Sequence, residues 1–152
     1  MRLRTLPLSV SGILAGAALV TSRDANFRIS FVFALLTTVL LQILSNLAND
    51  YGDSQNGADN AFRVGPQRAV QSGAISSRAM KRGMIVTGVI AFLSGVALLW
   101  TSFGWRQEWV PFILFFLLGI LAIIAAIRYT AGSNPYGYRG LGDVYVMLFF
   151  GI

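Results

Sequence analysis

Residues 109–127 read WVPFILFFLLGILAIIAAI, a run without a charged side chain. A helix rises 1.5 Å per residue, so roughly 20 apolar residues cross a hydrocarbon core of about 30 Å. Other uncharged runs of similar length are Thr5–Ser22, Ile29–Asn49 and Gly83–Trp105, and a shorter one is Val144–Ile152. The sequence therefore predicts an all-α, polytopic membrane helix bundle with four complete transmembrane helices and the start of a fifth.

The composition agrees with a lipid environment. Of the 152 residues, 55% are hydrophobic and only 12% are charged, about half the usual charged fraction of soluble domains. The chain has no His and no Cys, which excludes zinc fingers, Cys/His metal sites, Ser-His-Asp triads and disulfides. Any metal must therefore be held by oxygen ligands.

The basic residues indicate the topology. With the N-terminus in the cytoplasm, they fall mainly in predicted cytoplasmic segments, as the positive-inside rule expects. The cytoplasmic group is Arg2, Arg4, Arg63, Arg68, Arg78, Lys81, Arg82, Arg128 and Arg139, and the opposite group is Arg23, Arg28 and Arg106. We therefore interpret the net charge of +6 as a topology signal, and we do not expect nucleic-acid binding.

An alternative for the first apolar run is a secretory signal peptide, because two arginines precede it. A retained helix accounts better for the alternating charges of the loops. The short last run, Val144–Ile152, leads us to expect that the chain is part of a longer protein, because a helix ending inside lipid leaves carbonyl groups unpaired.

Two predicted cytoplasmic loops, 49–82 and 128–143, are rich in glycine and arginine. Ser76 or Ser77 is a suitable cap for the helix that follows the first loop. Because both loops lie on the same side of the membrane, we expect them to form a pocket together.

The first loop begins with a cluster of acids and amides. Asp50 and Asp53 are three residues apart at the end of the second predicted helix, with Asn46 and Asn49 one turn earlier, so all four side chains lie close together. Such an oxygen-only cluster suits Mg²⁺, which often binds through one or two carboxylates plus substrate phosphates. Asp59 follows a glycine turn and is placed to fold back toward the same ion. The alternative is an ordinary polar helix end, where Asn, Asp and Gly are common.

Arg63 and Arg68 follow the acids within a Gly/Pro loop. Guanidinium groups bind phosphate oxygens in pairs, so acids followed by arginines suit a diphosphate bound with Mg²⁺. The alternative is that these arginines only set the topology.

These motifs, in this order, resemble the UbiA family of intramembrane prenyltransferases. Within that family the pattern is most similar to the branch that prenylates 1,4-dihydroxy-2-naphthoate in menaquinone biosynthesis. The matching segments are TLPLS at 5–9, NLANDYGD at 46–53, GAD at 57–59, RVGPQR at 63–68, SG at 72–73 and NPYGYRGLGD at 134–143.

The resemblance implies a role for each candidate residue. Asp50 and Asp53 would bind Mg²⁺ with a polyprenyl diphosphate and act as catalytic residues, together with Tyr129 near the reacting centre. Contacts to the substrates would come from Asn46, Asn49, Asp59, Arg63, Arg68 and Asp143.

The resemblance also implies the reaction and its location. The polyprenyl group would pass to 1,4-dihydroxy-2-naphthoate with loss of CO₂, giving demethylmenaquinone, in a multi-pass protein of the plasma or inner membrane. The family is a nine-helix bundle with a second Asp-rich motif later in the chain. Residues 1–152 are therefore expected to be the truncated N-terminal part of one transmembrane domain, inactive alone. Alternatives are another aromatic acceptor, such as 4-hydroxybenzoate, homogentisate or a chlorophyllide, and half of a transporter.

Overall fold

The computed structural model describes residues 6–21, 25–56, 69–132 and 135–141, together with positions 144 and 147. The described residues form helices and the turns between them. In chain order these are α1 (Leu6–Ala18), α2 (Ala25–Gln55), α3 (Ser77–Ser102), the 3₁₀ turn η2 (Gly104–Arg106), α4 (Trp109–Arg128) and the 3₁₀ turn η3 (Tyr136–Arg139).

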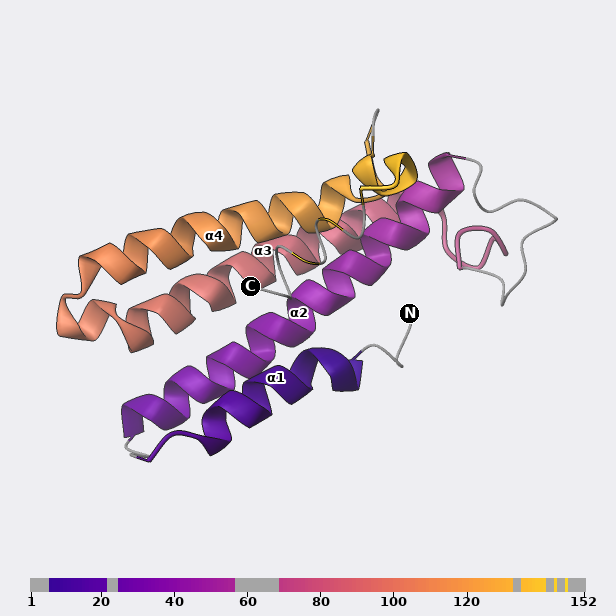
Figure 1. Ribbon diagram of the computed structural model, residues 1–152. Helices are drawn as coiled ribbons and strands as arrows, with labels where there is room; N and C mark the ends of the chain where they lie inside the picture. The colour runs from indigo at the N-terminus through magenta and orange to yellow at the C-terminus, as the bar shows by residue number, and fades with distance from the viewer. Residues whose placement is uncertain are drawn as a thin grey trace.

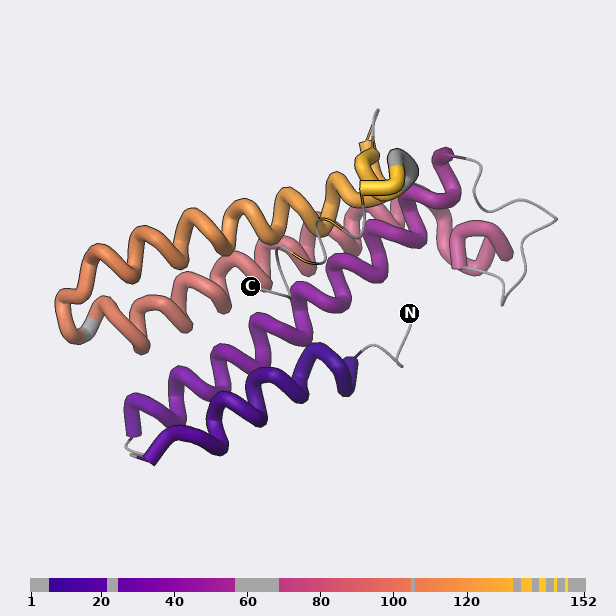
Figure 2. Tube along the Cα trace, viewed as in Figure 1, coloured from indigo at the N-terminus to yellow at the C-terminus, as the bar shows by residue number. Residues whose placement is uncertain are grey.

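The helices run back and forth along one direction (Figure 1). α3 and α4 form an antiparallel hairpin through η2, and α2 packs along α3, while α1 lies beside the first half of α2 (Figure 2). As a result, the C-terminal ends of α2 and α4 meet at one end of the bundle, and the α3–α4 turn lies at the other (Figure 1). This arrangement agrees with the predicted alternation of loops.

Within the described part of the chain, three helices are long and apolar enough to cross a membrane, namely α2, α3 and α4. The first uncharged run forms α1, which has 13 residues and a length of about 20 Å, and which is shorter than the other three. The helix ends early because the amides of Leu19 and Val20 turn back to the carbonyls of Gly16 and Ala17. Hydrogen bonds between residues three apart thus replace the α-helical hydrogen bonds between residues four apart.

Local sequence explains where the other helices begin and end. Ser76 caps α3, with its Oγ accepting a hydrogen bond of 3.3 Å from the Ala79 amide, which confirms the predicted cap. Pro111 lies in the first turn of α4, where a missing amide hydrogen costs nothing. Between α3 and α4, Gln107 adopts a left-handed conformation with φ 57°, which lets the chain reverse.

Small and hydroxyl side chains hold α2 against α3. The Cβ positions of Gly83, Gly88 and Gly95 would each lie 3.8 Å from an α2 side chain, so the helices approach closely without overlap. Thr37 and Ser94 form a hydrogen bond of 2.8 Å between α2 and α3. Ser9 of α1 similarly donates to the Gln42 Oε1 of α2 at 2.6 Å.

The buried core lies toward the end where α2 and α4 meet. It consists of Leu44, Ala48, Met84 and Ala131, with Leu47, Tyr51, Ile123 and Ile127 packed around it. Only 6%, 17% and 0% of the residues in the apolar windows of the three long helices are buried, and many large apolar side chains on these helices are exposed. Exposed apolar surface of this extent is stable in lipid and not in water, so the structure is consistent with a membrane helix bundle.

Candidate functional site

The last turns of α2 carry the predicted acids and amides. α2 continues to Gln55, so Asn46, Asn49, Asp50 and Asp53 all lie on regular helix, with Asn46 buried and the other three half-buried. Residues three or four apart on a helix have Cβ atoms about 5 to 6 Å apart. The structure therefore brings these four side chains together.

A residue that the sequence did not indicate, Thr130, joins this cluster from the end of α4. Its side chain is buried, and its Oγ1 lies 3.0 Å from the Ala48 carbonyl oxygen and 2.9 Å from Asn49 Oδ1. Both partners belong to α2. The hydroxyl thus ties the C-terminal end of α4 to the turn that carries Asn49 and Asp50.

The Thr130 backbone also contacts α2, at Gly52. A Cβ at position 52 would overlap the Thr130 carbonyl oxygen, so only glycine allows this approach. The Asn56 side chain donates hydrogen bonds to the carbonyls of Gly52 at 2.9 Å and Thr130 at 3.1 Å. Asn56 thereby satisfies a carbonyl that the end of α4 would leave without a helical partner.

Tyr129 is the C-cap of α4 and is half-buried. Its ring meets the Tyr136 ring edge to face, with centroids 5.4 Å apart. Tyr136 is itself held by its hydroxyl, which donates to the Ala125 carbonyl at 2.7 Å. The Gly137 amide donates to the Tyr129 carbonyl at 2.9 Å. The turn η3 therefore fixes Tyr129 next to Thr130, at the same end of the bundle as Asp50 and Asp53.

Four predicted site residues lie outside the described part of the chain: Asp59, Arg63, Arg68 and Asp143. Their roles stay predictions, as does a pocket formed by the two loops. Within the described residues, no group of three or more Asp, Glu, His or Cys side chains is placed to hold a metal ion. Two carboxylates are a donor set that suits Mg²⁺, which often binds through one or two carboxylates plus waters and substrate phosphates. The metal-binding roles of Asp50 and Asp53 therefore stay predictions.

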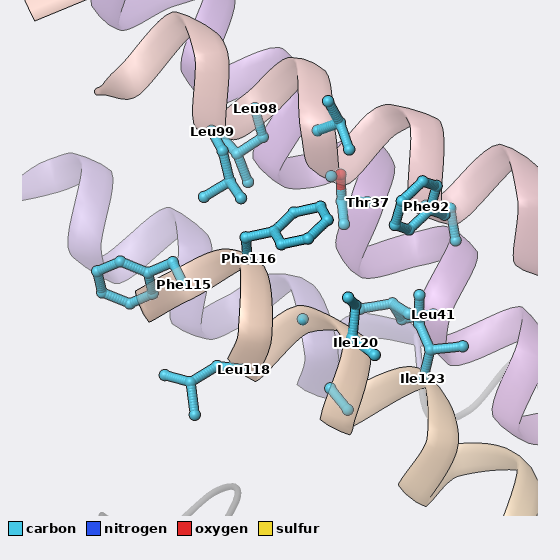
Figure 3. A pocket seen from close by; sticks show the side chains of 15 residues that line it. Thr37, Leu41, Phe92, Leu98, Leu99, Phe115, Phe116, Leu118, Ile120 and Ile123 are labelled. Carbon is cyan, nitrogen blue, oxygen red and sulfur yellow. The ribbon is translucent and has the colours of Figure 1, made fainter. Parts of the chain in front are cut away.

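An apolar cavity of about 570 Å³ lies further along the bundle. The rings of Phe92 from α3 and Phe116 from α4 meet edge to face beside it, and Thr37 lines it from α2 (Figure 3). Leu41 and Ile123 line the end of the cavity nearest the buried core around Leu44. This core lies between the cavity and the Asp50–Asp53 turn.

One sequence signal could have revealed part of the contact between the ends of α2 and α4. Glycine in a helix interior costs about 1 kcal/mol relative to alanine, so Gly52 between the two acids suggests a close backbone approach. Thr130 gives no comparable signal, because a threonine after an apolar helix has many possible roles.

The fold and the site together define a class: a membrane-spanning helix bundle with acids, amides and a tyrosine gathered at one end. Comparison with known proteins identifies the family within this class. The chain belongs to the UbiA prenyltransferase family, whose profile matches residues 9–152.

Several relatives are named 1,4-dihydroxy-2-naphthoate octaprenyltransferase. The protein of that name from Haemophilus influenzae is 47% identical over 99% of this chain and 49% of its own length. The one from Escherichia coli is 47% identical over 99% of this chain and 48% of its own length. The one from Mycobacterium leprae is 34% identical over 99% of this chain and 48% of its own length.

The chain thus spans about half the length of the curated relatives that it matches. No solved structure gives a significant match. These comparisons establish the family of the chain.

Proposed function

We propose that the intact protein carrying this chain transfers a polyprenyl group from its diphosphate to 1,4-dihydroxy-2-naphthoate in menaquinone biosynthesis. The observation that carries the proposal is the contact between the ends of α2 and α4. There Asp50 and Asp53 follow Asn49, the partner of Thr130, by one and four residues. The names of the relatives support the same acceptor and suggest an octaprenyl donor.

The chemistry follows from the residues at this end. Asp50 and Asp53 would hold Mg²⁺, which when bound supplies positive charge to the departing diphosphate. Asn46 and Asn49 would support the two carboxylates. Arg63 and Arg68 would bind the remaining phosphate oxygens through paired hydrogen bonds, and Asp59 and Asp143 would complete the substrate contacts.

The reaction consists of one bond exchange at each substrate. The C1–O bond of the polyprenyl diphosphate breaks, and its electron pair leaves with the diphosphate. The allylic C1 then bonds to the ring carbon that carries the carboxylate. That carboxylate leaves as CO₂, and the electrons of its C–C bond restore the aromatic ring, giving demethylmenaquinol, the reduced form of demethylmenaquinone.

Tyr129 would stabilise the allylic cation during this exchange, because an aromatic ring attracts a cation to its face. Its position at the end of α4 is fixed by Tyr136 and by the Gly137 amide. The polyprenyl chain is apolar and would remain among the membrane helices. The apolar cavity beside Phe92 and Phe116 offers one such space.

We further propose that the protein resides in the plasma or inner membrane, with the N-terminus and the Asp-bearing end of the bundle facing the cytoplasm. The three spanning helices support a multi-pass membrane protein. The distribution of basic residues supports the orientation.

The test uses the intact protein in detergent with octaprenyl diphosphate, 1,4-dihydroxy-2-naphthoate and Mg²⁺. Diphosphate and CO₂ should be released in equal amounts with a prenylated naphthoquinol, and EDTA should stop all three. With 4-hydroxybenzoate, homogentisate or a chlorophyllide as acceptor, no prenyl transfer is expected. Transfer to one of these acceptors, with the naphthoate left unchanged, would overturn the proposed acceptor within the family.

A further inference from the structure

The Thr130 hydroxyl is a buried polar group that the proposed reaction does not use. The residue is 5% exposed, and its Oγ1 lies within 3.0 Å of two oxygen atoms of α2. Those partners are 82 and 81 positions away in the chain. A contact of this kind fixes tertiary structure, because it joins two helices that the sequence separates widely.

Both α2 partners are acceptors, so the single hydroxyl hydrogen of Thr130 is shared between them. The two contacts have different consequences. The Ala48 carbonyl belongs to the helical backbone, so a hydrogen bond there fixes the position of α2 against α4. The Asn49 oxygen belongs to a side chain, so a hydrogen bond there fixes the rotamer of that carboxamide. Asn49 lies four residues before Asp53 on α2, so the two side chains share a face of the helix, and the orientation of the carboxamide affects the polar surroundings of the proposed ion.

We propose that Thr130 is a positioning residue of the diphosphate and magnesium site: its hydroxyl orients the Asn49 carboxamide and holds the Asp-bearing turn of α2 against α4. This inference rests on the proposed function. Thr130 does not touch substrate in this role. It acts through Asn49, and the packing of Gly52 against the Thr130 carbonyl supplies the close approach that makes the hydroxyl contact possible.

The test compares Thr130→Val and Thr130→Ser in the intact protein. Valine keeps the shape of threonine and removes the hydroxyl, whereas serine keeps the hydroxyl. Loss of a single buried hydrogen bond corresponds to a roughly three- to tenfold change in an equilibrium constant. We expect Thr130→Val to raise the Mg²⁺ concentration for half-maximal activity and the KM for polyprenyl diphosphate by about that factor, and Thr130→Ser to restore both.

Thr101→Val is a matched control at the opposite end of the bundle. Thr101 Oγ1 also joins two helices, accepting from Ser30 Oγ at 3.0 Å and donating to the Leu98 carbonyl at 3.0 Å. Thr101→Val should lose about as much thermal stability as Thr130→Val and should keep the wild-type Mg²⁺ dependence of activity. Equal Mg²⁺ dependence for Thr130→Val and Thr101→Val would overturn the inference, because Thr130 would then be only structural.

A double-mutant cycle with Asn49→Ala tests whether Thr130 acts through Asn49. The two substitutions should be non-additive, since Thr130→Val has nothing left to misplace once the carboxamide is gone. Additive effects on the Mg²⁺ dependence would contradict the inference. If Thr130→Val does not fold, the pair Thr130→Ser and Thr130→Ala repeats the comparison of hydroxyl and no hydroxyl, and equal Mg²⁺ dependence in that pair also counts against it.

The outcomes separate this inference from the proposed function. If the wild-type protein transfers no polyprenyl group in the presence of Mg²⁺, the proposed function fails before Thr130 is considered. If the wild-type protein is active and the threonine variants behave alike, the function stands and the positioning role of Thr130 is wrong.

Discussion

Gly52 of α2 and Thr130 at the end of α4 approach so closely that a Cβ on residue 52 would overlap the Thr130 carbonyl oxygen. This glycine lies between the two acids of the candidate site. The proximity of the two helix ends therefore depends on the absence of a single side-chain atom.

We expect Gly52→Ala to separate the ends of α2 and α4. Overpacking in a closely packed region costs about 1 to 3 kcal/mol, so the thermal stability in detergent should fall and activity should be lost. Gly83→Ala is the matched control, because a Cβ there meets Leu47 at an ordinary 3.8 Å. Equal stability of the two alanine variants would show that the Gly52 contact is not a constraint.

Much of the fold is predictable from single-sequence patterns. The three long apolar runs, the Ser76 cap and the helical spacing of Asp50 and Asp53 all depend on neighbours close in the chain. The end of α1 was not predictable from hydropathy. Hydropathy does not show that the amides of Leu19 and Val20 bond to carbonyls three residues back instead of four.

The contact between Thr130 and Asn49 could not be predicted for a different reason. Its partners are 81 positions apart, and no periodicity or spacing connects them. Asn56 is similar, since its hydrogen bond to the Thr130 carbonyl joins residues 74 positions apart. Only Gly52 gave a local hint, as a glycine within a helix.

The ring of Tyr129 should matter more than its hydroxyl. A cation–π contact contributes about 0.5 to 2 kcal/mol, so Tyr129→Leu should lower kcat roughly tenfold, whereas Tyr129→Phe should stay within a few-fold of wild type. Tyr136→Phe is the control, because it removes the hydrogen bond to the Ala125 carbonyl and should lower stability more than kcat. A phenylalanine variant at position 129 as slow as the leucine variant would instead assign the effect to the hydroxyl.

The alternating arrangement of the helices predicts opposite sides for two loops. Ser72 precedes α3 and Glu108 precedes α4, and both are exposed. The chain has no cysteine of its own, so Ser72→Cys and Glu108→Cys can be labelled separately once any cysteines elsewhere in the intact protein are replaced. An impermeant thiol reagent added outside should label Glu108→Cys in intact cells and Ser72→Cys only after lysis. Labelling of Ser72→Cys in intact cells would reverse the proposed orientation.

The carboxylates of Asp50 and Asp53 should be essential to the rate in the intact protein. Removing a main electrostatic stabiliser of developing charge costs about 100- to 1,000-fold in kcat, so Asp50→Asn and Asp53→Asn should each lose that much at saturating Mg²⁺. Asparagine keeps nearly the same shape, so the helix and its contact with Thr130 should persist and thermal stability should change little.

Glu108→Gln provides the comparison for the two acids, because it neutralises an exposed carboxylate at the N-cap of α4, and that end of α4 lies opposite the Asp-bearing end of the bundle (Figure 1). It should retain wild-type kcat and the wild-type response to Mg²⁺. Because all three substitutions remove one negative charge without removing bulk, any difference among them reports the position of the carboxylate. If Asp53→Asn and Glu108→Gln had equal kcat, the acids of α2 would be an ordinary polar helix end, and the ion would have to be held by other residues.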